Sequence, residues 1–154
     1  MRDEEGIAME KIEPVVKTLS LNVSAEKAFH HFTANIHLWW PLAGHSLSQA
    51  DAQSVVFEAH EGGRIYEVEK SGREREWGRV HHCDAPHRLI FSWVLEAPEK
   101  ATEVEIEFAD QDDGKSTLTL IHRGWDNRED GAEWRGNYDT GWEGVLAEYR
   151  FALN

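Results

Sequence analysis

The chain has 154 residues, of which 40% are hydrophobic and 29% charged, a composition typical of a single globular domain. Its net charge of −13 argues against nucleic acid and anionic membrane surfaces as partners, because both require clustered lysine and arginine. No apolar run approaches the roughly 18 residues of a membrane span. The single cysteine, Cys83, precludes an internal disulfide, so we expect a cytoplasmic protein.

The N-terminal segment and the first strand differ clearly in pattern. Residues 1–11 are charged and lack periodicity, so we expect a disordered tail, followed by one domain over residues 12–154. Apolar residues alternate with polar ones from Val15 to Val23. This period of two predicts a long first strand.

Two short helices are expected after the first strand. Ser24 is a candidate N-cap for a short amphipathic helix, and Asn35 is a candidate N-cap for a second one. Pro41 is expected to end the second helix. Residues 42–53 carry no periodic pattern and are predicted to form a loop.

Six further strands are expected, each bounded by glycine, proline or aspartate. They span residues 54–60, 64–70, 77–83, 88–96, 102–110 and 116–123. The clearest is 102–110, where Val104, Ile106 and Phe108 alternate with glutamates that are expected to face solvent. The links between these strands are short, which favours antiparallel neighbours.

The longest helical pattern covers residues 132–154. Its apolar stripe consists of Trp134, Tyr138, Trp142, Val145, Leu146, Tyr149 and Leu153. Gly136 is a poor helix former, so the regular helix is expected to begin near Tyr138. Gly141 and Gly144 would each cost roughly 1 kcal/mol relative to alanine. They indicate either room for a neighbouring backbone or ligand, or simple tolerance of a weak helix.

This order of elements predicts an α+β fold. A seven-stranded, curved antiparallel sheet would wrap around the long C-terminal helix, with two short helices between the first two strands, because two-layer packing buries both apolar faces. The short helices would close one end of the sheet. A curved sheet rarely closes completely around one helix, so we expect a cavity between them.

One stretch of the sequence carries a family signature. The run Trp77-Gly-Arg-Val-His-His-Cys-Asp-Ala-Pro-His-Arg-Leu-Ile-Phe-Ser-Trp93 resembles the pattern "G-x-V, then D-x-P-x-R-L-x-F-x-W". This pattern is typical of the activator of heat-shock protein 90 ATPase homologue-like branch of the START-like, SRPBCC, helix-grip superfamily. Supporting matches are Ser24–Phe29, Trp39–Pro41, Gly62–Arg64 and Gly141–Trp142.

The resemblance implies a helix-grip fold with a hydrophobic cavity. Across the superfamily such cavities bind lipids, sterols, hormones or polyketides, and some members are enzymes. The eukaryotic co-chaperone for which the branch is named adds a separate N-terminal domain. We find no such domain in this sequence, so the resemblance gives less support to a chaperone-activating role.

The nine histidines form no metal-binding pattern. His30–His31 and His81–His82 are adjacent pairs, whose side chains point in different directions on a helix or strand. The sequence therefore predicts no metal and no cofactor. His122 continues the inward-facing series of its strand and is expected to present a titratable ring to the cavity. The alternative is a hydrogen-bonded core histidine.

The aromatic residues provide the strongest functional signal, since the chain contains 7 tryptophans. Trp93 falls on the inward face of its strand and Trp142 at the centre of the helical stripe. Tyr66 is included although neither face of its strand is cleanly apolar. The candidate ligand-binding residues are Trp39, Trp40, Tyr66, Trp93, His122 and Trp142. The alternative is that the aromatic residues are ordinary core.

Three functional hypotheses follow. The first is a non-catalytic protein that binds a small hydrophobic or aromatic ligand in the cavity. The second is an enzyme in which His122, with a carboxylate such as Glu67, performs acid–base chemistry. The third is a co-chaperone-like or regulatory module that binds a protein partner or forms a homodimer, which predicts an exposed apolar patch and a filled interior.

Overall fold

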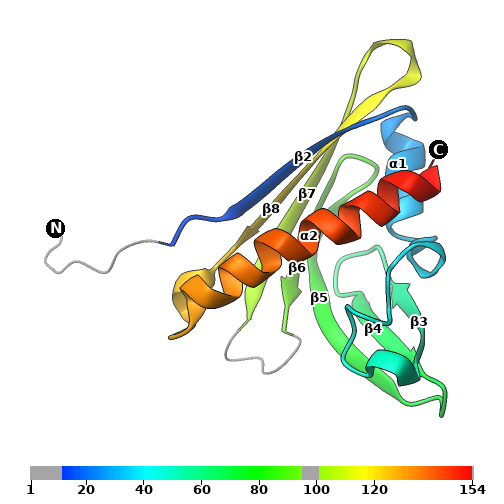
Figure 1. Ribbon diagram of the computed structural model, residues 1–154. Helices are drawn as coiled ribbons and strands as arrows, with labels where there is room; N and C mark the ends of the chain where they lie inside the picture. The colour runs from blue at the N-terminus through cyan, green and yellow to red at the C-terminus, as the bar shows by residue number, and fades with distance from the viewer. Residues whose placement is uncertain (1–11, 95–100, 154) are drawn as a thin grey trace, which may run out of the picture.

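A computed structural model describes residues 12–94 and 101–153 of the chain (Figure 1). The elements in order are β2 (Val15–Leu21), α1 (Ala25–Phe32), the 3₁₀ turns η1 (Ile36–Leu38) and η2 (Gln49–Asp51), β3 (Ala52–Phe57), β4 (Arg64–Glu69), β5 (Glu74–Asp84), β6 (Arg88–Trp93), β7 (Thr102–Asp110), η4 (Asp112–Gly114), β8 (Ser116–Arg123), η5 (Trp125–Asn127) and α2 (Gly131–Leu153). The expectations for the tail 1–11, the strand end at Glu96 and the helix end at Asn154 lie outside the described residues.

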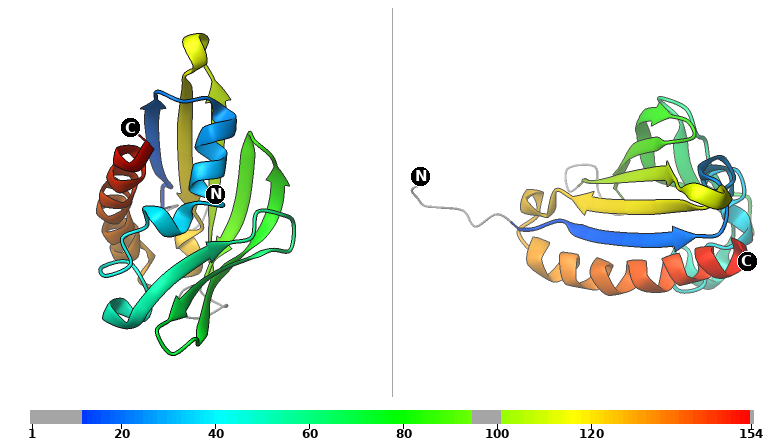
Figure 2. Two further views of the ribbon diagram at one scale, coloured as in Figure 1. Left: turned by 90° about the vertical axis from the view of Figure 1, so that its right-hand side faces the viewer. Right: turned by 90° about the horizontal axis from the view of Figure 1, so that it is seen from above.

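The strands form one seven-stranded sheet in the order β2-β8-β7-β6-β5-β4-β3, and all neighbouring pairs are antiparallel. The sheet curves strongly, and α2 lies across its concave face (Figure 2). The predicted α+β fold is confirmed, including the short helical segments between the first two strands. The β3–β4, β4–β5 and β5–β6 pairs each contain a register shift, an irregularity of the kind that increases local twist.

Close approach between β5 and β6 explains one glycine of the family signature. A Cβ atom at Gly78 would lie 1.8 Å from the backbone oxygen of Ser92, so a larger residue would push the two strands apart. On the next inward-facing position, Val80 is buried in the core. The sequence motif therefore specifies local strand geometry.

The two short helices after β2 differ in how they are capped. Ser24 is the N-cap of α1, as predicted, and its side chain accepts a hydrogen bond from the backbone N–H of Lys27. The Asp110 side chain also accepts from the Ala25 N–H at 2.9 Å. The second helix is a single 3₁₀ turn, and Asn35 makes no side-chain capping bond. The Ile36 N–H at its start donates instead to the Thr33 backbone oxygen at 3.2 Å.

The long helix α2 begins at Gly131, so the prediction of a start near Tyr138 is wrong. Glycine is needed at this start, because a Cβ atom at Gly131 would lie 1.9 Å from the Trp125 backbone oxygen. The guanidinium of Arg135 donates to the backbone oxygens of Glu13 and Pro14. These tertiary contacts offset the low helix propensity of the first turns.

The outer face of the sheet corrects another expectation. Glu105 does not face solvent as predicted but is only 8% exposed. It accepts hydrogen bonds from Arg88 at 2.7 Å and from Arg123 at 2.9 Å. Burial disfavours its charge, but these two hydrogen bonds outweigh that effect and hold the pKa of the carboxyl below its ordinary value.

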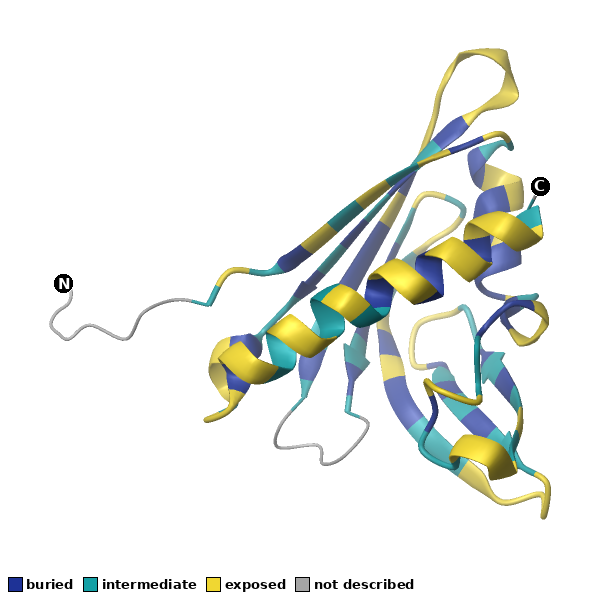
Figure 3. Ribbon diagram, viewed as in Figure 1, coloured by how far each residue is buried: buried dark blue, intermediate teal, exposed yellow. Residues whose placement is uncertain are grey.

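The core lies between the sheet and α2, where the buried residues of both face each other (Figure 3). At the end covered by α1 it is packed with aromatic rings. The ring of Phe32 lies 5.2 Å from that of Trp39 and 5.4 Å from that of Tyr149. The Tyr149 hydroxyl donates to the Ala28 backbone oxygen at 2.7 Å and ties α2 to α1.

Candidate ligand-binding site

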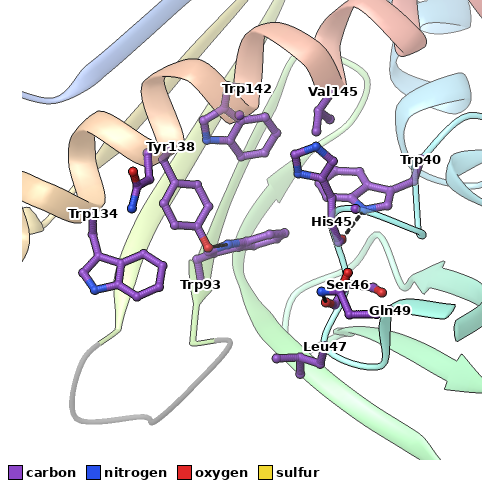
Figure 4. A pocket seen from close by; sticks show the side chains of 13 residues that line it. Trp40, His45, Ser46, Leu47, Gln49, Trp93, Trp134, Tyr138, Trp142 and Val145 are labelled. Carbon is purple, nitrogen blue, oxygen red and sulfur yellow. Dashed lines mark hydrogen bonds between the residues drawn. The ribbon is translucent and has the colours of Figure 1, made fainter. Parts of the chain in front are cut away.

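A pocket of about 400 Å³ opens beside α2, between β6 and the loop that carries η2 (Figure 4). Its size falls within the range typical of small-molecule sites. Five aromatic side chains line it: Trp40, Trp93, Trp134, Tyr138 and Trp142. The loop adds a more polar wall, consisting of Gly44, His45, Ser46, Leu47 and Gln49.

Three indoles form the inner part of the pocket. The ring centroids of Trp40, Trp93 and Trp142 are each 6.0 Å from the other two. Each indole N–H donates a hydrogen bond within the protein. Trp40 donates to the His45 backbone oxygen at 2.8 Å, and Trp93 donates to the Tyr138 hydroxyl at 3.0 Å. Trp142 donates to His122. Because the N–H groups are occupied, these tryptophans offer apolar ring surface to a ligand.

His122 lies behind the pocket and is fully buried. Its Nδ1 accepts the Trp142 indole N–H at 3.0 Å, so the proton of the neutral ring must be on Nε2. Nε2 then donates to the Thr102 hydroxyl at 2.7 Å, and this hydroxyl donates to the Trp93 backbone oxygen at 3.4 Å. His122 therefore connects the helix and strand that carry two of the pocket tryptophans.

This geometry differs from the expectation that His122 presents a titratable ring to the cavity. His122 is not among the residues that line the pocket. Burial lowers its pKa to about 3, and both ring nitrogens are engaged in hydrogen bonds. The side chain fits the alternative interpretation, a hydrogen-bonded core histidine.

The remaining predicted residues occupy three different environments. Trp40, Trp93 and Trp142 line the pocket, whereas Trp39 lies in the solid part of the core, where its indole donates to the His31 backbone oxygen at 2.8 Å. Tyr66 is on the outer face of β4, and the Arg64 guanidinium lies 4.0 Å from its ring centre. The alternation along β4 places Ile65 and Glu67 inward instead.

Sequence similarity shows the family of this chain. Residues 22–150 match the sequence profile of the family described as "Activator of Hsp90 ATPase homolog 1-like protein". The chain belongs to this family. No curated protein is similar enough in sequence to be matched to it.

Several solved structures have a fold similar to that of this chain. The self-sacrificing resistance protein CalC from Micromonospora echinospora is 21% identical, with a TM-score of 0.70 over 92% of this chain and 94% of CalC. Protein MLL2253 from Mesorhizobium loti is 17% identical, with a TM-score of 0.68 over 91% of this chain and 96% of that protein. The anthrahydroquino-γ-pyrone synthase Txn09 is 30% identical, with a TM-score of 0.59 over 84% of this chain and 88% of Txn09.

Glu67 and His122 do not form the acid–base pair considered from the sequence. Glu67 is fully buried, and its carboxylate accepts from the Leu47 and Ser48 backbone N–H groups and from the Trp77 indole. The hydrogen-bonding partners of His122 are different groups altogether. In this family member each of the two titratable residues belongs to its own hydrogen-bond network.

Sequence reasoning missed more than half of the pocket lining. Trp134 and Tyr138 belong to the predicted helical stripe, so extending the aromatic set along that stripe would have found them. The loop around His45 gave no such signal, because it has no periodicity and lies far from α2 in the chain. Gly141 does line the pocket, and a Cβ atom there would lie 3.7 Å from the His45 ring.

Two further features of the described residues bear on function. Within residues 12–94 and 101–153 there is no group of three or more histidine, cysteine, aspartate or glutamate side chains that could bind a metal ion. In the same part of the chain, no helix is both long enough and apolar enough to cross a membrane.

Proposed function

We propose that this protein binds a small, planar and largely apolar aromatic ligand in the pocket beside α2. The observation that carries the proposal is the aromatic wall formed by Trp40, Trp93 and Trp142 at mutual ring distances of 6.0 Å. Their N–H groups are already bonded within the protein, which leaves ring faces and edges for contact with a ligand. Polar selectivity would come from the loop side chains His45 and Gln49.

The energetics of such a pocket are adequate for specific binding. Burial of apolar surface stabilises by roughly 25 cal/mol per Å². Aromatic contacts in favourable geometry add about 0.5–1.5 kcal/mol each. After the cost of ordering the ligand, affinities in the micromolar range are expected. The hydrogen bonds within the wall also reduce the cost of ordering the protein side chains, because the rings are held in place before the ligand arrives.

A relative at 30% identity supports the choice of ligand class. Txn09 is named as an anthrahydroquino-γ-pyrone synthase and was solved as a complex with a ligand called SUM. That name describes a fused aromatic ring system, which is planar and offers a large apolar face. A polycyclic aromatic compound with oxygen substituents is therefore the first class to test on this chain.

The test is a titration of tryptophan fluorescence with four probes: 2-naphthol, 1,8-dihydroxyanthraquinone, palmitate and progesterone. We expect the two aromatic probes to bind more tightly than the others. Gly141→Leu should weaken their binding at least roughly tenfold, because its side chain would project towards His45 and fill the pocket. The matched control is Gly144→Leu, since a Cβ atom at Gly144 meets nothing within 4 Å. Equal affinities in the two variants would contradict the pocket assignment.

A second candidate function is catalysis in the same pocket. Two observations favour it: the relative at 30% identity is named a synthase, and His45 places an imidazole in the pocket lining. The acid–base candidate thus moves from His122 to His45. If turnover of a pocket-binding compound is found, His45→Ala should reduce kcat by about 10²–10⁴-fold. The exposed His37 provides a matched control, and an equal loss in His37→Ala would count against this role.

The third hypothesis, a protein-interaction module, receives less support. It predicted a filled interior, whereas a pocket of about 400 Å³ is found. The large apolar side chains exposed among the described residues are Val16, Leu38 and Phe151. They lie on β2, η1 and α2, so they come from three separate elements.

A further inference from the structure

Glu67 is an unusual group for the interior of this protein. It lies on β4 and is 0% exposed. Burial alone would raise the pKa of its carboxyl, but hydrogen bonds from Ser48, Leu47 and Trp77 outweigh burial and lower it. The side chain is therefore ionised at neutral pH. Among the residues that the structure describes, no lysine, arginine or histidine forms an ion pair with it, so N–H donors compensate its charge.

The first two donors come from the loop that forms the polar wall of the pocket. The Leu47 N–H donates to Oε1 at 2.6 Å, and the Ser48 N–H donates to Oε2 at 2.8 Å. Both residues are distant from Glu67 in sequence, by 20 and 19 positions. Leu47 itself lines the pocket, and the neighbouring Gln49 and Ser46 line it as well.

The third donor belongs to the aromatic wall. The Trp77 indole N–H donates to the same Oε1 at 2.5 Å. The Trp77 ring centroid lies 5.2 Å from that of Trp40 and 5.6 Å from that of Trp93, and both of these rings line the pocket. One carboxylate oxygen therefore connects the loop wall to the residue that supports the aromatic wall.

The loop needs such an anchor because it has little structure of its own. Between Trp40 and β3 its only regular element is the single turn η2. Its other contacts with the sheet include the Ser48 hydroxyl to Glu69 at 2.7 Å and the Lys70 N–H to the Asp51 oxygen at 2.9 Å. Neither of these reaches the aromatic wall, and the bond from the Trp40 indole to the His45 oxygen joins the loop to that wall but not to the sheet. Hydrogen bonds to a charged acceptor are also stronger than those to a neutral one.

We propose that Glu67 is a positioning residue for ligand binding: its buried carboxylate sets the distance between the loop wall and the tryptophan wall of the pocket. This inference rests on the proposed function. It also replaces the acid–base role considered for Glu67, because the carboxylate faces three donors of the protein instead of a ligand. A glutamine amide at this position has one acceptor oxygen. That oxygen cannot accept hydrogen bonds from Leu47, Ser48 and Trp77 at the same time.

The test compares two isosteric variants, Glu67→Gln and Glu105→Gln. Glu105 is the matched control because it is also a buried, hydrogen-bonded carboxylate, but it lies on the outer face of the sheet. Binding of 1,8-dihydroxyanthraquinone should weaken roughly ten- to hundredfold in Glu67→Gln and stay unchanged in Glu105→Gln. Urea unfolding of both variants measures their stability and so shows whether a loss of affinity is explained by partial unfolding. Equal affinities of Glu67→Gln and wild type would overturn the proposal.

Hydrogen exchange of the loop amides provides a readout that needs no ligand. In the wild type, the Leu47 and Ser48 amides should be protected by more than roughly tenfold, and Glu67→Gln should remove the protection of at least one of them while leaving the amides of β7 and β8 unchanged. Unprotected amides in the wild type would overturn the proposal, even if Glu67→Gln fails to fold. If the wild type binds none of the four probes, the proposed function fails, and amide exchange alone decides the role of Glu67.

Discussion

The two ends of the space between the sheet and α2 contain similar side chains but are packed differently. At the end covered by α1, the rings of Phe32, Trp39 and Tyr149 lie within 5.4 Å of each other. At the other end, Trp93 and Trp142 also approach each other, yet a pocket of about 400 Å³ remains beside them. The content of aromatic residues is therefore not what decides whether the space is filled.

The covering element is what differs. At the solid end, α1 inserts Phe29 and Phe32 as knobs between the sheet and α2. At the pocket end the cover is an irregular loop, which is attached through its backbone to Glu67 and inserts no large ring behind Trp40. A helix presents side chains on every turn, whereas an anchored loop can leave space beneath it. The pocket therefore lies at the end of the sheet that is covered by a loop and not by a helix.

The largest expected effect tests the solid end. Phe32→Ala should lower the free energy of unfolding by about 3–5 kcal/mol, because its ring is 1% exposed and the surrounding rings cannot collapse into the void. Trp134→Ala, at the half-buried edge of the pocket, should cost only about 1 kcal/mol. Urea denaturation measures both. If the two variants lost similar amounts of unfolding free energy, the two ends would be equally well packed, contrary to the difference described above.

A second, smaller effect concerns His122, which is buried behind the pocket. The pKa of His122 is about 3 in the folded protein because of burial, against 6.5 for an ordinary histidine. Between about pH 3 and pH 6.5 the unfolded chain therefore binds more protons at this site, so this contribution to stability is complete above pH 6.5 and is lost as the pH falls towards 3. The free energy of unfolding should decrease by up to about 1.4 kcal/mol per pH unit.

His122→Gln isolates this contribution, since the amide keeps one donor and one acceptor for Thr102 and Trp142. Denaturation midpoints between pH 7 and pH 5 should show a shallower dependence in the variant than in the wild type. Identical slopes would indicate that water reaches His122 from the pocket and that its pKa is not lowered by burial.

The smallest expected effect sharpens the contrast at the solid end. Tyr149→Phe removes the hydroxyl that donates to the Ala28 backbone oxygen at 2.7 Å and leaves the ring in place. The variant should lose about 1 kcal/mol of stability, the typical value of one buried hydrogen bond. Ligand affinity should stay unchanged, because Tyr149 does not line the pocket. Thermal unfolding and the fluorescence titration measure the two quantities, and a change in affinity would show that the two ends are coupled.

Much of the fold was predictable from sequence because its signals are local. The period of two predicted the bounds of β7 (Thr102–Asp110) and β8 (Ser116–Arg123) correctly. Ser24 was recognised as an N-cap from its type and position. The start of α2 was misplaced, because contacts of Gly131 with the distant Trp125 backbone outweigh the propensity of the first turns.

The candidate site was predictable only in part. Inward alternation and the helical stripe selected Trp93 and Trp142, which do line the pocket. The same logic placed His122 inward but could not show that Trp142 and Thr102 occupy both of its ring nitrogens. Tyr66 was assigned without a clear pattern, and the structure places it on the outer face.

The order of the elements, the buried faces of β6, β7, β8 and α2, and the resemblance to the family could all be recognised from the sequence. Periodicity and capping act between residues a few positions apart, and so they can be read along the chain. Only the tertiary structure decided which inward residues meet a cavity and which are enclosed. The physical reason is that Glu67, His122 and the loop around His45 owe their roles to hydrogen bonds between residues about 20 positions apart, and no local pattern encodes such contacts.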